Sequence, residues 1–182
     1  MTKRADAGEA KAPGDSAAFS ADQRAQILHH LLKLTNRLHA PFSTWLEKRH
    51  RISLSEFRLL MIIGRIGVTA SHELAEETGL NTMRVSRAVA SLQANGRIEV
   101  RTDPNNRRRK TLRLTPEGRR LYEQMLPTTD AVASYLFESL RLDEILAFDR
   151  YVTTLIDSLE ARDQQGRSLF LERTRPPGST DE

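Results

Sequence analysis

Residues 71–96 read SHELAEETGLNTMRVSRAVASLQANG, and this segment carries the strongest structural signal in the chain. Gly79 is placed to end a first short helix, because glycine readily adopts the left-handed conformation that closes helices. A second helix is expected over residues 83–94, where Asn95-Gly96 would end it. Two helices joined by about three residues that include a glycine are typical of a helix-turn-helix. The small core between them is expected from Leu74, Ala75, Leu80, Val85, Val89 and Leu92.

After the second helix the apolar residues change from a helical period to alternation. Ile98 and Val100 alternate with charged residues. The same alternation returns at Leu112 and Leu114, after a polar loop. This pattern predicts the two strands of a hairpin. A hairpin directly after a helix-turn-helix is a wing, so residues 67–117 are expected to form a winged helix-turn-helix module.

Amphipathic helices are expected on both sides of this module. One begins near Asp22, and Pro41 should end it or kink it. Another follows Ser55, which can act as its N-cap. Two more follow the hairpin, starting near Pro116 and near Asp143. Their long apolar stripes need a partner, and a second copy of the chain is expected to cover them in a two-fold dimer.

The sequence therefore predicts a mainly α fold with a small β-wing, in the order α-α-α-α-β-β-α-α. The first residues lack periodicity and are rich in small and charged side chains, which is typical of disorder. The expected parts are a flexible N-terminal arm (1–20), N-terminal helices for dimerisation and support (21–66), the winged helix-turn-helix (67–117), C-terminal dimerisation helices (118–161) and a polar, mobile tail (162–182).

Charge is segregated along the chain. The net charge is +4, yet residues 81–120 hold eleven basic and three acidic residues, so this stretch carries +8 and the remainder −4. Such segregation indicates a local surface for a polyanion on an otherwise acidic body.

Composition excludes several other classes. The chain has no cysteine, which excludes disulfides, thiolate zinc sites and cysteine redox sensing. No apolar run approaches the ~20 residues that cross a bilayer. The first residues also lack the apolar segment of a signal peptide. We expect a soluble cytoplasmic protein with no cofactor, no metal and no membrane partner.

Four short motifs give the chain a resemblance to a known family: ELAEETGL at residues 73–80, VSRAV at 85–89, DPNNRR at 103–108 and LTPEG at 114–118. In this order and spacing they resemble the MarR family, over about residues 22–160. The resemblance implies an obligate homodimer with interlocked terminal helices that binds palindromic DNA. It also implies control of transcription, commonly by repression that a small molecule relieves.

The wing departs from the family pattern at one position. Wings of the family usually carry an Asp-x-Arg triplet, whereas Asn106-Arg107-Arg108 stands there in this chain. The wing arginine of the family corresponds to Arg108, and its carboxylate partner is replaced by an amide. An amide accepts a hydrogen bond without charge assistance, so a looser wing is expected, with Asp103 as a candidate substitute.

The residues expected to contact DNA fall into two groups. The second helix of the module would enter the major groove and present its N-terminal residues to base edges, with Arg84 or Arg87 pairing with guanine. An arginine of the wing would enter the minor groove. The candidate residues are Thr82, Met83, Arg84, Ser86 and Arg87 on the helix, and Asn106, Arg107, Arg108, Arg109 and Lys110 on the wing.

A ligand site is expected where family effectors commonly bind, between the dimerisation helices and the DNA module. An imidazole or a guanidinium beside an aromatic wall suits a small aromatic carboxylate, such as a salicylate-like or hydroxynicotinate-like acid. The candidate ligand-binding residues are His29, His39, Trp45, Arg49 and Arg58.

Three other functions are alternatives to a ligand-released repressor. An enzyme is disfavoured, because no phosphate-binding loop, nucleophile elbow or metal-ligand spacing occurs and no catalytic residue can be assigned. A winged-helix scaffold that binds protein would expose apolar residues on its second helix, where Arg84, Ser86 and Arg87 stand instead. A regulator or activator without a small-molecule effector remains open.

Overall fold

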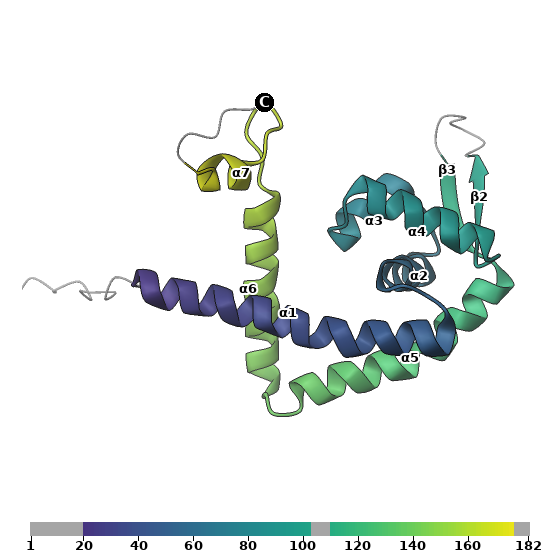
Figure 1. Cartoon of the computed structure of the whole chain (residues 1–182), viewed down its shortest axis with the longest axis horizontal. Coiled ribbons are helices and arrows are strands. Elements are labelled where there is room, and N and C mark those ends of the chain that lie inside the picture. Colours follow the sequence, from purple (N-terminus) through teal and green to yellow (C-terminus); the bar gives the residue numbers. More distant parts are fainter. Residues whose placement is uncertain (1–19, 103–109, 177–182) are drawn as a thin grey trace, which may run out of the picture. The chain divides into compact units, whose positions relative to one another are not determined.

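The computed structural model describes residues 20–102 and 110–176. It is mainly helical with one three-stranded antiparallel sheet, which confirms the predicted fold class (Figure 1). The described chain divides into two compact units, one ending at Tyr122 and the other beginning at Glu123. No described helix is long and apolar enough to cross a membrane. The elements are α1 (Ala21–His50), α2 (Leu54–Ile66), β1 (Val68–Ala70), α3 (Ser71–Thr78), α4 (Thr82–Ala94), β2 (Ile98–Thr102), β3 (Lys110–Leu114), α5 (Pro116–Phe137), α6 (Leu142–Glu160) and α7 (Leu169–Thr174).

Helix α1 continues through Pro41 to His50, so the alternative that this proline ends the helix is wrong. A proline inside a helix costs about 3 kcal/mol, because it removes a hydrogen bond and crowds the preceding turn. Tertiary contacts hold the turns that follow it. Leu46 is fully buried, and the ring of Phe42 packs edge-on against Phe57 of α2 at 4.9 Å between centroids. Burying such side chains contributes about 1.5–3 kcal/mol each, which offsets the cost of the proline.

Helix α2 begins two residues earlier than predicted, with Ser53 rather than Ser55 as its N-cap. The Ser53 hydroxyl accepts the backbone N–H of Glu56 at 3.3 Å, and the Glu56 carboxylate accepts the backbone N–H of Ser53 at 2.8 Å. This reciprocal capping box satisfies two donors that the start of a helix would otherwise leave without partners. Ser55 lies inside the first turn instead.

In the sheet, β3 lies between β1 and β2, and both pairs are antiparallel. Leu112 is the central residue, because it pairs with Val100 on one side and with Thr69 on the other. The sequence does not predict β1, since its three residues are too few to show alternation. Its pairing depends on the chain reversal at Gly67, which ends α2 at a φ of 92° that favours glycine.

The core of the first unit lies around α2, which contacts α3, α4 and β3. Figure 1 shows α3 and α4 lying beside α2, with the β2–β3 hairpin beyond them. The core predicted for the helix-turn-helix is confirmed for Leu74, Leu80, Val85 and Leu92, while Ala75 and Val89 are only half-buried. The buried side chains include Leu59, Leu60, Ile63, Leu74, Leu80, Val85, Ala88, Leu92, Ile98 and Leu112.

The second unit contains the rest of α5 with α6 and α7. Its apolar side chains are largely exposed, and α6 has no buried residue, although the rings of Phe137 and Phe148 lie 6.3 Å apart. The sequence predicts only a polar tail after Arg162, but a turn and α7 follow. The carboxylate of Asp163 accepts two backbone N–H groups of this turn, and Ser168 caps α7. Both features depend on single polar side chains, which produce no periodic signal.

Candidate nucleic-acid interface

The turn before α4 sets the orientation of this helix. Gly79 closes α3 in the left-handed region at a φ of 63°, as the sequence predicts. The side chain of Asn81 then caps α4, because its Oδ1 accepts the backbone N–H of Arg84 at 2.9 Å. Val85 and Leu92 anchor the inner face of α4, with exposed fractions of 1% and 0%.

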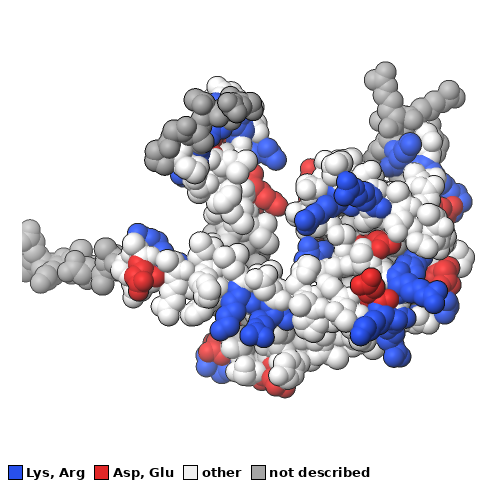
Figure 2. Space-filling view, in the orientation of Figure 1, with Lys and Arg blue, Asp and Glu red and all other residues white. Residues whose placement is uncertain are grey.

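The outer face of α4 carries all five of the predicted major-groove residues. They are exposed and come from the first two turns: Thr82, Met83, Arg84, Ser86 and Arg87. Neither Arg84 nor Arg87 has an ion-pair partner among the described residues, whereas Arg65 pairs with Glu77 at 2.9 Å and Arg120 with Glu117 at 2.8 Å. The unpaired guanidinium groups are available to a ligand outside the chain. Figure 2 shows Lys and Arg side chains gathered over this unit, with fewer Asp and Glu side chains between them.

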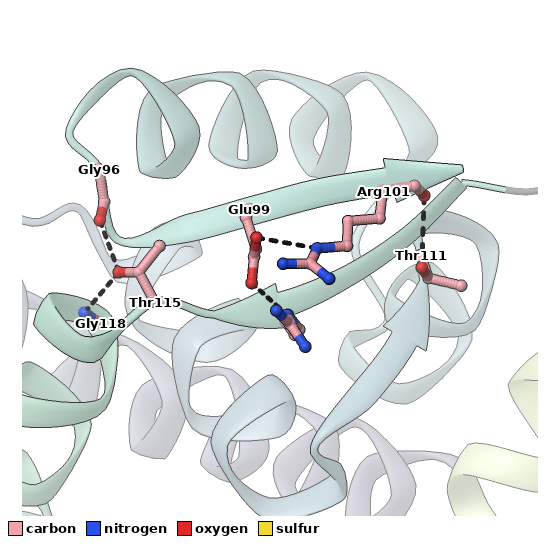
Figure 3. A network of polar contacts seen from close by, with 7 residues as sticks. Gly96, Glu99, Arg101, Thr111, Thr115 and Gly118 are labelled. Carbon is pink, nitrogen blue, oxygen red and sulfur yellow. Dashed lines mark hydrogen bonds and ion pairs between the residues drawn. The ribbon is translucent and has the colours of Figure 1, made fainter. Parts of the chain in front are cut away.

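The described part of the wing holds its charges in a fixed pattern (Figure 3). Glu99 and Arg113 are directly opposite each other on β2 and β3. The Glu99 carboxylate accepts hydrogen bonds from Nε of Arg113 and from Nε of Arg101, the latter at 3.0 Å. The hydrogen bond from Arg113, followed by that from Arg101, holds the pKa of Glu99 below its ordinary value. The cluster has two cations for one anion, and its role is to order the stem of the hairpin.

The tip of the wing lies outside the described residues. This applies to Asn106, Arg107, Arg108 and Arg109, and to the expected substitution by Asp103. Lys110 is described as the exposed first residue of β3. The roles of these wing residues therefore stay predictions.

The base of the hairpin is closed by Thr115, as Figure 3 shows. Its hydroxyl donates to the carbonyl oxygen of Gly96 at 2.6 Å and accepts the backbone N–H of Gly118 at 3.1 Å. Gly118 lies so close to the backbone of Arg97 that a Cβ at this position would overlap the Arg97 carbonyl oxygen. The Leu-Thr-Pro-Glu-Gly motif therefore has a structural purpose, since it fixes the wing to the first turn of α5.

Arg97 is one of the eleven basic residues of the 81–120 stretch, but the structure gives it an internal role. Its guanidinium donates to the carbonyl oxygens of His50 at 2.9 Å and Arg51 at 3.1 Å, at the end of α1. A cation there also interacts favourably with the C-terminal end of the helix dipole. Burial, and then the positive charges of Arg49 and Arg97, lower the pKa of His50. No sequence pattern marks this contact, because it joins residues 46 and 47 positions apart.

A buried carboxylate connects α2 to α4. Glu56 is 7% exposed, and its Oε2 accepts hydrogen bonds from the backbone N–H and the hydroxyl of Ser53. Its Oε1 accepts from the hydroxyl of Ser91 at 2.7 Å. Sequence reasoning missed this residue, although the Ser-x-x-Glu spacing of the capping box was a signal that could have found it.

The candidate ligand-binding residues do not form one group. His39 and Arg58 line a common cavity of about 630 Å³ in the first unit. Trp45 instead stacks on Phe42, with ring centroids 6.0 Å apart, and contacts His50. His29 and Arg49 are exposed on α1, and neither they nor Trp45 line this cavity. Among the described residues no group of three His, Asp or Glu side chains could hold a metal ion.

Residues 52–110 match the family model described as the MarR family. The transcriptional repressor NicR of Pseudomonas putida is 23% identical over 149 residues, which cover 82% of this chain and 92% of that protein. The phenylalanine–tRNA ligase alpha subunit of Metallosphaera sedula is 32% identical over 94 residues. That match spans 52% of this chain but only 20% of the subunit, so it carries no activity over.

Solved structures show the same fold. A MarR-family regulator from Silicibacter pomeroyi has a TM-score of 0.67 at 21% identity, covering 82% of this chain and 99% of its own. Streptococcus pneumoniae FabT, solved in complex with DNA, has a TM-score of 0.63 at 21% identity, covering 75% and 97%. Bordetella bronchiseptica BpsR, whose DNA binding is regulated by 6-hydroxynicotinic acid, has a TM-score of 0.62 at 24% identity, covering 71% and 98%. With the winged helix-turn-helix described above, the match over residues 52–110 makes this segment of the chain similar to the MarR family, and a solved regulator of that family has the same fold.

Proposed function

We propose that this regulator is a homodimeric repressor that reads a palindromic operator and releases it when a small carboxylate binds. The observation that carries the proposal is the outer face of α4. It presents Arg84 and Arg87, exposed and unpaired among the described residues, on a helix whose inner face is anchored by buried Val85 and Leu92. The FabT structure was solved with DNA, and NicR is named a repressor, which supports the same use of the fold here.

In this proposal the major-groove helix reads bases. Arg84 and Arg87 can each present a planar fork of donors to O6 and N7 of guanine, which discriminates by about 1–3 kcal/mol per good contact. Thr82, Met83 and Ser86 then make phosphate, mixed or apolar contacts. The wing residues Asn106–Lys110 would add minor-groove or backbone affinity that depends little on sequence.

A second copy is the partner that best suits the exposed apolar side chains. They lie on the N-terminal half of α1 and on the second unit, and such stripes on a monomer are unstable in water. A two-fold dimer would present two copies of α4 to DNA, separated by about one helical turn of DNA, roughly 34–36 Å. The exposed side chains include Ile27, Leu28, Leu31, Leu32, Tyr135, Leu142, Leu146, Tyr151, Leu155 and Leu159.

Selection of duplex fragments from a random library by the purified full-length protein tests the proposal. We expect an inverted repeat whose half-sites lie one helical turn apart, and binding that weakens steeply with salt. A protein that selects no duplex above background at low salt contradicts the proposal and favours a winged-helix scaffold for protein. Selection that succeeds while no carboxylate alters binding favours the regulator without an effector.

A further inference from the structure

Arg51 lies in the turn between α1 and α2 and has an unusual backbone conformation. Its φ of 50° is in the left-handed region, and among the described residues it is the only one other than glycine with a positive φ. This conformation costs free energy in any residue that carries a Cβ, so glycine ordinarily occupies it, as Gly79 does at the end of α3. Glycine at position 51 would therefore suit the turn better than arginine does.

The side chain of Arg51 makes no described polar contact that would offset this cost. The turn uses only the backbone of this residue. Its N–H donates to the carbonyl oxygen of Glu47 at 3.0 Å, and its own carbonyl oxygen accepts from Arg97 at 3.1 Å. Any residue could provide these two groups. Arg51 is exposed, and its guanidinium has no hydrogen-bond or ion-pair partner among the described residues. A side chain that occupies a strained position without an internal role indicates a partner outside the chain.

The positive charges around Arg51 indicate that this partner is an anion. Arg51, Arg58 and Arg84 all line the cavity of about 630 Å³, which lies within the first unit. They come from the turn after α1, from α2 and from α4. None of the three guanidinium groups has a hydrogen-bond or ion-pair partner in the described part of the chain. Positive charges that converge on one cavity repel each other, and an anion bound beside them removes that repulsion.

The carboxylates of the cavity wall do not neutralise these arginines. The carboxylate of Glu56 already accepts hydrogen bonds from the hydroxyls of Ser53 and Ser91. Glu47 is exposed and forms no ion pair with a described cation. Among its described residues the wall therefore carries three arginines and two carboxylates, and its net charge is positive.

The position of the cavity favours DNA as the anion. Arg84 lines the cavity and also lies on the outer face of α4, the face proposed to enter the major groove. A second cavity, of about 290 Å³, is lined by Arg84 and Arg87 together with Ser55 from the first turn of α2. The start of α2 therefore lies beside the first turns of α4. Phosphate backbones border the major groove, so a cation beside the helix that reads bases meets phosphates rather than base edges.

We infer that Arg51 binds a phosphate of the DNA backbone, next to the bases that Arg84 reads. The inference rests on the proposed function and adds a third region of DNA contact to α4 and the wing, at the junction of α1 and α2. A guanidinium suits this partner, because its planar fork of donors makes two charge-assisted hydrogen bonds to phosphate oxygens. A phosphate contact carries no base information, so Arg51 would supply affinity and fix the register of α4 in the groove.

Arg51→Gly separates this role from a structural one. Glycine adopts a positive φ without strain, so we expect the variant to melt at the temperature of the unaltered protein or above it. Its affinity for the selected duplex should fall about tenfold or more, the loss typical of a hydrogen bond between charged groups. The salt dependence should become shallower by about one unit for each chain that binds the duplex. Thermal denaturation measures the first effect, and fluorescence anisotropy at several salt concentrations measures the other two.

Duplexes with single neutral phosphates locate the contact. Each duplex of a series carries a methylphosphonate at one position, which removes one phosphate charge. We expect the unaltered protein to lose about tenfold in affinity at the phosphate that Arg51 binds, and Arg51→Gly to lose little there, as for the two partners of one contact. Arg51→Asn, which tolerates the left-handed region, is the second variant should the glycine variant fold poorly. Arg37→Ala removes an exposed arginine of α1 that lines neither cavity, and should behave like the unaltered protein throughout.

The outcomes distinguish the inference from the proposed function. Equal duplex affinity and salt dependence in Arg51→Gly and in the unaltered protein overturn the inference alone. The same pattern of methylphosphonate losses in both proteins also overturns it. A variant that binds the duplex normally but loses thermal stabilisation by inorganic phosphate assigns Arg51 to a free anion instead, which again overturns the inference. An unaltered protein that binds no duplex overturns the proposed function, and the inference with it.

Discussion

The hydroxyl of Ser91 donates a hydrogen bond of 2.7 Å to Oε1 of Glu56, across 35 residues of sequence. Because the other oxygen of this carboxylate caps α2, one side chain holds both the start of α2 and the last turn of α4. The orientation of the helix proposed to read DNA therefore depends on a residue that does not itself face DNA. It also depends on Asn81 and Gly79 in the turn before it.

We expect Glu56→Ala to destabilise the fold by about 1–3 kcal/mol, because it leaves the half-buried hydroxyl of Ser91 and the capping donors of Ser53 without their acceptor. Urea denaturation followed by circular dichroism measures the change. Glu76→Ala, at an exposed position of α3, is the control and should shift stability by less than about 0.5 kcal/mol. Equal stability of the two variants would show that Glu56 does not tie the helices together.

Gly118→Ala should also destabilise the protein, although alanine is ordinarily favoured over glycine inside a helix by about 1 kcal/mol. The reason is the overlap of the new Cβ with the carbonyl oxygen of Arg97. Gly96→Ala is a useful comparison, because space is open there and the cost comes only from a φ of 66°. We expect a cost of about 1–2 kcal/mol at Gly96 and a larger one at Gly118. Thermal denaturation compares the two, and a neutral Gly118→Ala contradicts the close contact.

Alanine substitutions of the α4 arginines and of the wing arginine should affect DNA binding in different ways. Arg84→Ala or Arg87→Ala should relax the choice of base at one position of each half-site, at a cost of about 1–3 kcal/mol on the best sequence. Arg108→Ala should weaken binding to all duplexes and reduce the salt slope by about one unit.

Fluorescence anisotropy at several salt concentrations, on the selected duplex and on a scrambled one, measures both effects. Arg120→Ala is a matched control, because Arg120 belongs to the same basic stretch but is paired with Glu117. We expect it to bind like the unaltered protein. Unchanged operator affinity in both the α4 and the wing variants would contradict the docking geometry.

The imidazole of His50 should make stability depend on pH. Its Nε2 is buried with no hydrogen-bond partner among the described residues, and burial, followed by the positive charges of Arg49 and Arg97, lowers its pKa below 6.5 in the folded state. Below that pH the unfolded chain binds a proton that the folded chain resists, so stability falls as the pH drops from 6.5 towards the lowered pKa. Thermal denaturation between about pH 7.5 and 5.5 should show this fall in stability. These pH values lie about one unit either side of the ordinary pKa of histidine. His50→Asn should reduce that dependence, and an identical dependence in the variant would assign the effect to other groups.

The winged helix-turn-helix could be predicted because its signals are local. Gly79 and Asn81 act on their own helices, and the alternation around Val100 and Leu112 survives in the strands. The missed features depend on contacts between distant segments. Helix α1 passes Pro41 because Leu46 is buried, and β1 forms because β3 offers it an edge.

The candidate interface on α4 could be predicted from the sequence, whereas the cavity could not. Exposure of the five α4 residues follows from the helical period around Val85, so the sequence could assign them to one face. The cavity joins α1, α2 and α4, and a sequence pattern cannot show which side chains meet across three helices. His39 and Arg58 were identified by residue type, but only the folded chain shows that Arg51 and Arg84 line the same cavity.

The guanidinium of Arg97 donates hydrogen bonds to two carbonyl oxygens, and this limits which residues can replace it during evolution. Lysine would preserve the charge, yet a single ammonium group lacks the rigid, planar fork of donors that reaches both oxygens at once. Exchange of arginine for lysine, which sequence comparisons score as almost neutral, is therefore not neutral here. We expect arginine at position 97 to be replaced more rarely than a residue kept only for its positive charge. We also expect it to be retained in related proteins that no longer bind DNA.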